Sequence, residues 1–80
     1  MKQKNFTKTE LELLKNLEIF PQGETVTNPY SGKSVYLEPE AVALYDLIKG
    51  AEVVNNTKLF NRALTMFRKY WPNEYMVLLD

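Results

Sequence analysis

The sequence predicts a single small domain of the α+β class that is predominantly helical. Apolar residues recur at three- and four-residue intervals over three long stretches, which is the spacing of one helix face. Between the first two stretches lies a region rich in β-branched residues and turn formers, which is typical of a β-hairpin. A chain of 80 residues is long enough for one core and too short for two. We therefore expect one globular domain over residues 7–80, preceded by a frayed segment over residues 1–6.

The first helix is expected over about residues 8–19. Thr7 and Glu10 have the spacing of a capping box, in which two side chains satisfy backbone N–H groups at a helix start. Leucines then follow at helical spacing. Pro21 and Gly23 are the residues expected to end this helix.

A hairpin is expected over about residues 24–37. Its two β-branched or aromatic segments are separated by the turn-forming run Asn-Pro-Tyr-Ser-Gly-Lys. Pro29 suits the second position of a turn, and Gly32 can adopt a positive φ. Two strands alone are marginally stable, so the hairpin must pack against helices.

The second helix is expected over about residues 39–54. Pro39 fits its first turn, where a missing N–H costs nothing. The apolar stripe passes through Gly50 without losing phase, at a cost of about 1 kcal/mol for an internal glycine. In the alternative, Gly50 ends the helix as a C-cap.

The third helix is expected over about residues 58–71, with Thr57 as its N-cap. Pro72 stops it and begins a short helix over about residues 73–79. Two antiparallel helices with consistent phase predict that the following residues are largely buried: Leu44, Leu47, Ile48, Ala51, Phe60, Leu64, Phe67 and Trp71.

The composition excludes most kinds of catalytic or metal site. The chain has no cysteine and no histidine, so disulfides, Cys/His zinc sites and Ser-His-Asp triads are ruled out. Gly32-Lys33-Ser34 matches the end of a phosphate-binding loop, but Thr27 stands where that loop needs its first glycine. No acidic loop suits calcium. We expect no enzyme activity and no cofactor, and the lack of an apolar targeting segment favours the cytoplasm.

Charge is unevenly distributed although it sums to zero. Residues 55–70 carry four basic residues and no acidic one, so a helix-turn-helix that places a basic third helix in a DNA groove is one interpretation. A DNA-binding domain usually has a clear basic excess, which favours a solvated face instead. The candidate nucleic-acid residues are Lys58, Arg62, Arg68 and Lys69.

Tyrosines provide the other candidate surface, because tyrosine is common among the residues that dominate protein interfaces. We expect part of one set to be exposed and to bind a protein partner or a second copy of the chain. The set is Tyr30, Tyr36, Tyr70 and Tyr75.

Four short motifs keep a distinctive spacing: NPYSG from residue 28, LEPEAVALYD from residue 37, WPNEY from residue 71 and LLD from residue 78. With them, residues 25–80 resemble a group of small proteins encoded by tailed bacteriophages and prophages. The resemblance implies a phage origin and assigns no catalytic residue. The function expected is a non-enzymatic protein-binding module that engages a host protein or a phage assembly, and the alternative is a small DNA-binding regulator.

Overall fold

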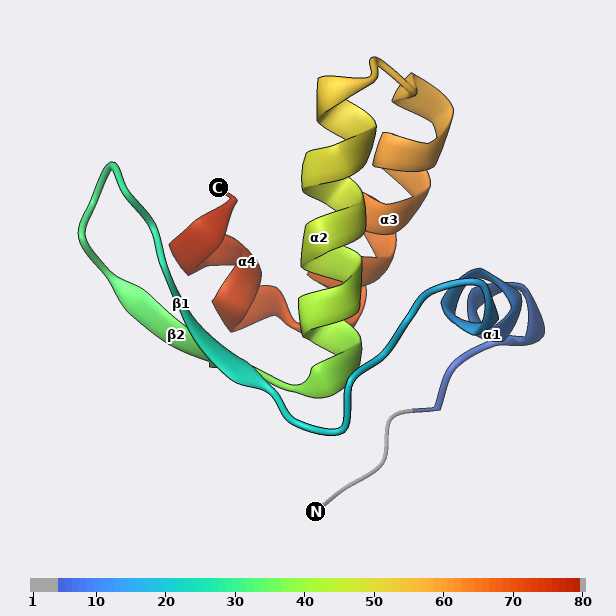
Figure 1. The fold of residues 1–80 in the computed structure, drawn as a ribbon, viewed down its shortest axis with the longest axis horizontal. Helices are drawn as coiled ribbons and strands as arrows, with labels where there is room; N and C mark the ends of the chain where they lie inside the picture. Colours follow the sequence, from blue (N-terminus) through green and yellow to red (C-terminus); the bar gives the residue numbers. More distant parts are fainter. Residues whose placement is uncertain (1–4, 80) are drawn as a thin grey trace.

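The computed structural model describes residues 5–79, which form helices and one two-stranded antiparallel sheet (Figure 1). This arrangement confirms the predicted α+β class with a predominance of helix. The elements in chain order are α1 (Lys8–Lys15), β1 (Glu24–Thr27), β2 (Ser34–Leu37), α2 (Pro39–Val53), α3 (Thr57–Tyr70) and α4 (Pro72–Leu78).

The antiparallel helices α2 and α3 form the centre of the fold, with α1 on one side and the hairpin on the other (Figure 1). Helix α4 packs on both α3 and strand β2. Their shared core includes Leu37, Leu44, Ile48 and Phe67, each with 1% or less of its surface exposed. The hairpin is therefore stabilised by helices, as a two-stranded sheet requires.

Five of the eight predicted core residues are fully buried: Leu44, Ile48, Ala51, Phe67 and Trp71. The other three, Leu47, Phe60 and Leu64, are partly buried and pack against the core. These three pack against the rim of the core, because the apolar stripes are wider than the contact between α2 and α3. The remaining buried residues come from every element except β1: Leu14, Leu37, Ala41, Ala43, Ala63, Met66 and Leu78.

Helix α1 begins as predicted and ends four residues earlier than predicted. Thr7 and Glu10 form the expected capping box. At the other end, the Asn16 N–H donates to Leu13 O at 3.3 Å, and its side-chain amide donates to Glu12 O at 3.2 Å. These bonds satisfy the last carbonyl groups and end the helix before Pro21 can do so.

Helix α2 continues through Gly50 to Val53, which excludes the alternative of a C-cap at that glycine. The left-handed residue that ends the helix is Asn55, with φ of 60°. Its N–H donates to Glu52 O at 3.2 Å, and the next N–H, from Asn56, donates to Ala51 O at 2.9 Å. This pair of bonds is a Schellman motif, in which asparagine takes the place of the usual glycine.

The start of α3 lies one residue earlier than predicted. Asn56, rather than Thr57, is the N-cap, and its side-chain oxygen accepts from the Leu59 N–H at 3.2 Å. Thr57 is the first helical residue. The two asparagines at 55 and 56 thus end one helix and begin the next.

Trp71 joins α3 to α4 and ties both to the start of α2. Its indole N–H donates to the Glu38 carboxylate at 2.8 Å, and its ring lies 5.8 Å from the Phe67 ring. The Phe6 ring lies 4.7 Å from Tyr70 and 6.2 Å from Trp71, so the packed chain includes one residue of the segment expected to fray. Residues 1–4 of that segment lie outside the described residues.

Within residues 5–79, the helices are too short and too polar for any of them to cross a bilayer.

Candidate protein-interaction surface

The hairpin has one buried face and one exposed face. Its register pairs Glu24 with Leu37, Thr25 with Tyr36, Val26 with Val35 and Thr27 with Ser34. Because side chains alternate along a strand, the two valines and Leu37 share the face that packs on α4. The opposite face is exposed and consists of hydroxyl-bearing side chains: Thr25, Thr27, Ser34 and Tyr36.

The connection between the strands, residues 28–33, is a turn held by several hydrogen bonds. The Asn28 N–H donates to Lys33 O and the Gly32 N–H donates to Asn28 O, both at 2.8 Å. Gly32 has φ of 77°, as the sequence predicted for this turn. We call residues 28–33 the Tyr30 turn.

The Asn28 side chain fixes the conformation of the Tyr30 turn further. The Asn28 side-chain oxygen accepts from the Tyr30 N–H at 2.8 Å, which makes an Asx-turn. The same side chain donates from its amide nitrogen to Val77 O in α4, also at 2.8 Å. Asn28 therefore anchors the turn to a helix 49 residues away.

Tyr30 and Tyr36 are exposed, and they differ in how they are held. Tyr30 projects from the turn with 97% of its surface exposed. Tyr36 is 55% exposed and lies across the exposed face of the hairpin, over Gly23. A Cβ atom on Gly23 would be 2.5 Å from the Tyr36 hydroxyl oxygen. The lack of a side chain at Gly23 therefore leaves room for the Tyr36 hydroxyl group.

Tyr70 and Tyr75 do not join this surface, because both are half-buried elsewhere. The Tyr70 hydroxyl bonds to the Glu10 carboxylate and to Asn5 O, the latter at 3.0 Å. The Arg68 guanidinium lies 5.8 Å from the centroid of the Tyr75 ring. The predicted set of four tyrosines thus divides into an exposed pair on the hairpin and a packed pair near α3.

Glu10 is the centre of a polar cluster that attaches α1 to the end of α3. Its carboxylate accepts from the Tyr70 hydroxyl, from the Thr7 N–H at 2.8 Å and from the Lys69 ammonium at 3.0 Å. Partial burial opposes ionisation of Glu10, but these hydrogen bonds outweigh it and lower its pKa to about 2. The hydrogen bond to Glu10 raises the pKa values of Lys69 and Tyr70.

Acid is expected to destabilise the attachment of α1. The Glu10 pKa falls from 4.5 when unfolded to about 2 when folded, so the carboxylate stabilises the fold fully above pH 4.5 and progressively less down to pH 2. Urea unfolding followed by circular dichroism at pH 7 and pH 3 measures this loss. The Glu10→Gln variant lacks this carboxylate and keeps all the others. It should therefore lose less stability between the two pH values than the wild type does. Equal losses would contradict a stabilising role for the Glu10 charge.

The four candidate nucleic-acid residues are all exposed, yet they do not form one free basic face. Lys58, Arg62 and Lys69 share a helix face by their spacing, whereas Arg68 points about 100° away from the centre of that face at about 100° per residue. Lys69 is paired with Glu10 at 3.0 Å, and Arg68 lies over Tyr75. Lys58 and Arg62 remain as the exposed cations without such a partner among the described residues.

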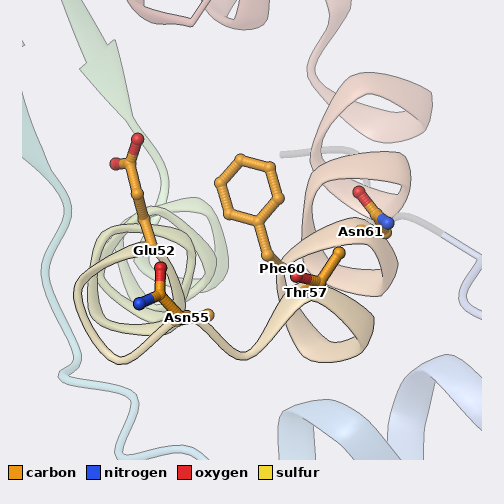
Figure 2. A pocket seen from close by; sticks show the side chains of 6 residues that line it. Glu52, Asn55, Thr57, Phe60 and Asn61 are labelled. Carbon is orange, nitrogen blue, oxygen red and sulfur yellow. The ribbon is translucent and has the colours of Figure 1, made fainter.

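A shallow pocket lies at the turn between α2 and α3, with a volume of about 310 Å³ (Figure 2). The Phe60 ring projects between Glu52 and Asn61, and Asn55 lies at the tip of the turn. Glu52 is the one titratable side chain in the lining. The pocket therefore offers a single carboxylate beside an apolar ring, and the described residues include no cluster of three potential metal-binding side chains.

No family model matches the chain, and no match was found among curated proteins or solved structures. The hairpin surface is therefore described from the residues of this chain alone. Sequence reasoning missed the Thr25 and Thr27 hydroxyl face and the Glu10 cluster. Alternation of side chains along the strand indicates the hydroxyl face. The Glu10 cluster joins residues about 60 positions apart in the sequence, so no local pattern indicates it.

Proposed function

We propose that this protein is a non-enzymatic protein-binding module and that Tyr30 is its main anchor for a partner. The observation that supports this function is the combination of a nearly fully exposed ring with a turn whose backbone is held by hydrogen bonds, both within the turn and to α4. Tyr30 is 97% exposed, while its own N–H is held by Asn28 and Asn28 is held by α4.

The physical basis is the small cost of ordering such a side chain. Tyrosine buries a large apolar area, has two χ angles to restrict and retains a hydroxyl group for a hydrogen bond. A backbone that is already ordered loses little entropy on binding. Tyr36, on the exposed face of the same hairpin, extends the contact area beyond the turn.

The biological setting that we propose is that of a tailed bacteriophage. The protein would act in the host cytoplasm as an accessory factor that binds a host protein or a phage assembly. Support comes from the resemblance of residues 25–80 to small phage and prophage proteins. Residues 28–32 of the Tyr30 turn form one of the motifs on which that resemblance is based. The proposed anchor, Tyr30, therefore lies within a motif that also supports the proposed phage origin.

Tyr30→Ala is expected to weaken partner binding by about 1–2 kcal/mol, or roughly tenfold, and to leave the urea midpoint unchanged. The partner is first captured from host or infected-cell lysate on the wild-type chain, and its affinity is then measured by calorimetry. Val53→Ala is the matched control, because Val53 is also highly exposed, at 81%, but lies on α2 away from the hairpin. Equal affinities for the wild type and Tyr30→Ala would reject Tyr30 as the anchor.

A DNA-binding regulator is the second candidate, favoured by the exposure of Lys58 and Arg62 on α3. It predicts retention on heparin or duplex DNA that falls steeply with salt. It also predicts that Arg62→Ala and Lys69→Ala abolish binding while Tyr30→Ala has no effect. Lys69 is engaged by Glu10, and the net charge is zero, so the protein-binding function is preferred.

A further inference from the structure

Strand β1 has one paired edge and one open edge. It packs chiefly on β2, whereas β2 also packs on α4 and α2. Three of its four residues are exposed, and Val26 is partly buried against the core. An open edge presents unpaired backbone N–H and C=O groups that can pair with another strand.

The pairing pattern shows which groups point outward from β1. The Asn28 N–H donates to Lys33 O, so these residues occupy a hydrogen-bonded position of the ladder. Hydrogen-bonded and non-hydrogen-bonded pairs alternate, which makes Thr27 and Ser34 a non-hydrogen-bonded pair. Their side-chain oxygens are 2.6 Å apart, as expected for the closer approach in such a pair.

The same alternation applies two residues earlier, at Thr25. The backbone N–H and C=O groups of Thr25 and Thr27 therefore point away from β2. No hydrogen bond links these groups to any other element in the described part of the chain. The open edge of β1 thus offers two donors and two acceptors at alternate residues.

Thr25-Val26-Thr27 reads the same in both directions, and we propose that this edge pairs with itself in a second copy of the chain. An antiparallel pair with its two-fold axis at Val26 sets Thr25 against the partner's Thr27 and Val26 against the partner's Val26. Each Thr–Thr position would exchange two backbone hydrogen bonds, because both residues direct these groups outward. Thr–Thr pairs across strands are also favourable.

Charge and space suit this register. Glu24 would lie opposite the partner's Asn28, so no like charges oppose each other across the new pair. The result is a four-stranded sheet with β1 strands in the centre and β2 strands at the edges. With strands about 4.8 Å apart, the two β2 strands are about 14 Å apart. That spacing accommodates one α4 from each copy, since a helix is about 10 Å wide.

The dimer goes beyond the proposed function, because it uses the strand edge and does not depend on Tyr30 as an anchor. An antiparallel arrangement would place the two Tyr30 turns at opposite ends of the sheet. A bivalent molecule would follow, with a higher apparent affinity for a repeated partner than one turn provides. So short a strand pair buries little area, and the dimer is expected to dissociate on dilution.

A charge-pair experiment tests the register. The double variant Thr25→Lys/Thr27→Lys would oppose like charges at both Thr–Thr positions and should weaken dimerisation about tenfold or more. The matched variant Thr25→Glu/Thr27→Lys loses the same Thr27–Ser34 hydroxyl contact but opposes unlike charges. It should dimerise at least as well as the wild type. Sedimentation velocity over a concentration series gives the dissociation constants.

Backbone amide exchange on the unmodified chain provides a measurement that does not depend on how the variants fold. The Thr25 and Thr27 amides should exchange rapidly in dilute solution and become protected as concentration rises. A chain that stays monomeric up to millimolar concentration would overturn the proposal. Two other results would also overturn it. One is a dimer whose dissociation constant changes equally in both double variants, and the other is protection of the Thr25 and Thr27 amides from exchange only when a foreign peptide is added. None of these three results bears on Tyr30, whose alanine variant tests the proposed function separately.

Discussion

Phe67→Ala is expected to lower the free energy of unfolding by about 3–5 kcal/mol. Phe67 has no exposed surface, and its ring centroid lies 5.8 Å from that of Trp71 and 6.4 Å from that of Tyr45. Truncation would leave a cavity where α2 and α3 meet the start of α4. For a small domain, a loss of this size is comparable to the whole stability. Urea unfolding followed by far-ultraviolet circular dichroism measures it.

Phe20→Ala is the matched control for Phe67→Ala. It removes the same ring from a residue that is 61% exposed in the segment after α1. Its free energy of unfolding should stay within about 0.5 kcal/mol of the wild-type value. If the two variants lost equal stability, the packing described for α2 and α3 would be incorrect.

Gly23→Ala is expected to destabilise the hairpin strongly. A Cβ atom at Gly23 would lie 2.0 Å from Leu37 O and 2.7 Å from the Tyr36 ring. The tyrosine can rotate away, but the carbonyl belongs to the backbone of β2 and cannot move without breaking the strand pairing. The expected loss is at the upper end for a single substitution, about 3 kcal/mol. Thermal unfolding by calorimetry measures it.

Gly50→Ala provides the control with the opposite sign. Gly50 lies inside α2, and an added Cβ would meet nothing within 4 Å. The same substitution should therefore stabilise the helix by about 1 kcal/mol, since alanine is the better helix former. A gain of stability at Gly23 would contradict the close approach described for the hairpin, and a loss at Gly50 would contradict the open space beside α2.

Local signals in the sequence predicted the elements and most of their starts. The Thr7–Glu10 capping box, Pro39 and Pro72 each act within one helical turn, and the structure has helices beginning beside all three. Gly32 was likewise identified from its neighbours as the positive-φ residue of the turn. Features of this kind depend on a few consecutive residues, so a sequence displays them directly.

Helix ends and burial were harder to predict, because several residue types can serve the same role. Asn55 adopts the left-handed conformation that ends α2, although Gly50 is the residue type that does so most often. Asn56 caps α3 where Thr57 is equally suitable by residue type. Phe60 belongs to the apolar stripe of α3 but lies at its rim, which only the positions of the other elements determine.

The candidate surface shows the same division. Tyr30 lies in a strong turn signal, so its exposure follows from local sequence. Tyr70 occupies the last residue of α3, and its hydroxyl contacts Asn5 and Glu10, which are 65 and 60 residues away. No pattern within α3 indicates that contact. The set of four tyrosines could therefore be named from the sequence but not divided into exposed and packed members.

The Asn28–Val77 hydrogen bond has a consequence for the order in which the chain folds. The α2–α3 pair joins residues close in sequence and can form early, because its loop is short. The Tyr30 turn and helix α1 instead rely on residues 69–77, which are synthesised after both of them. Helix α1 is held by Lys69 at the end of α3, and the Tyr30 turn is held by Val77 in α4, so each becomes fixed only after its partner helix has been synthesised. We expect the nascent chain to fix the Tyr30 turn only after α4 has been synthesised.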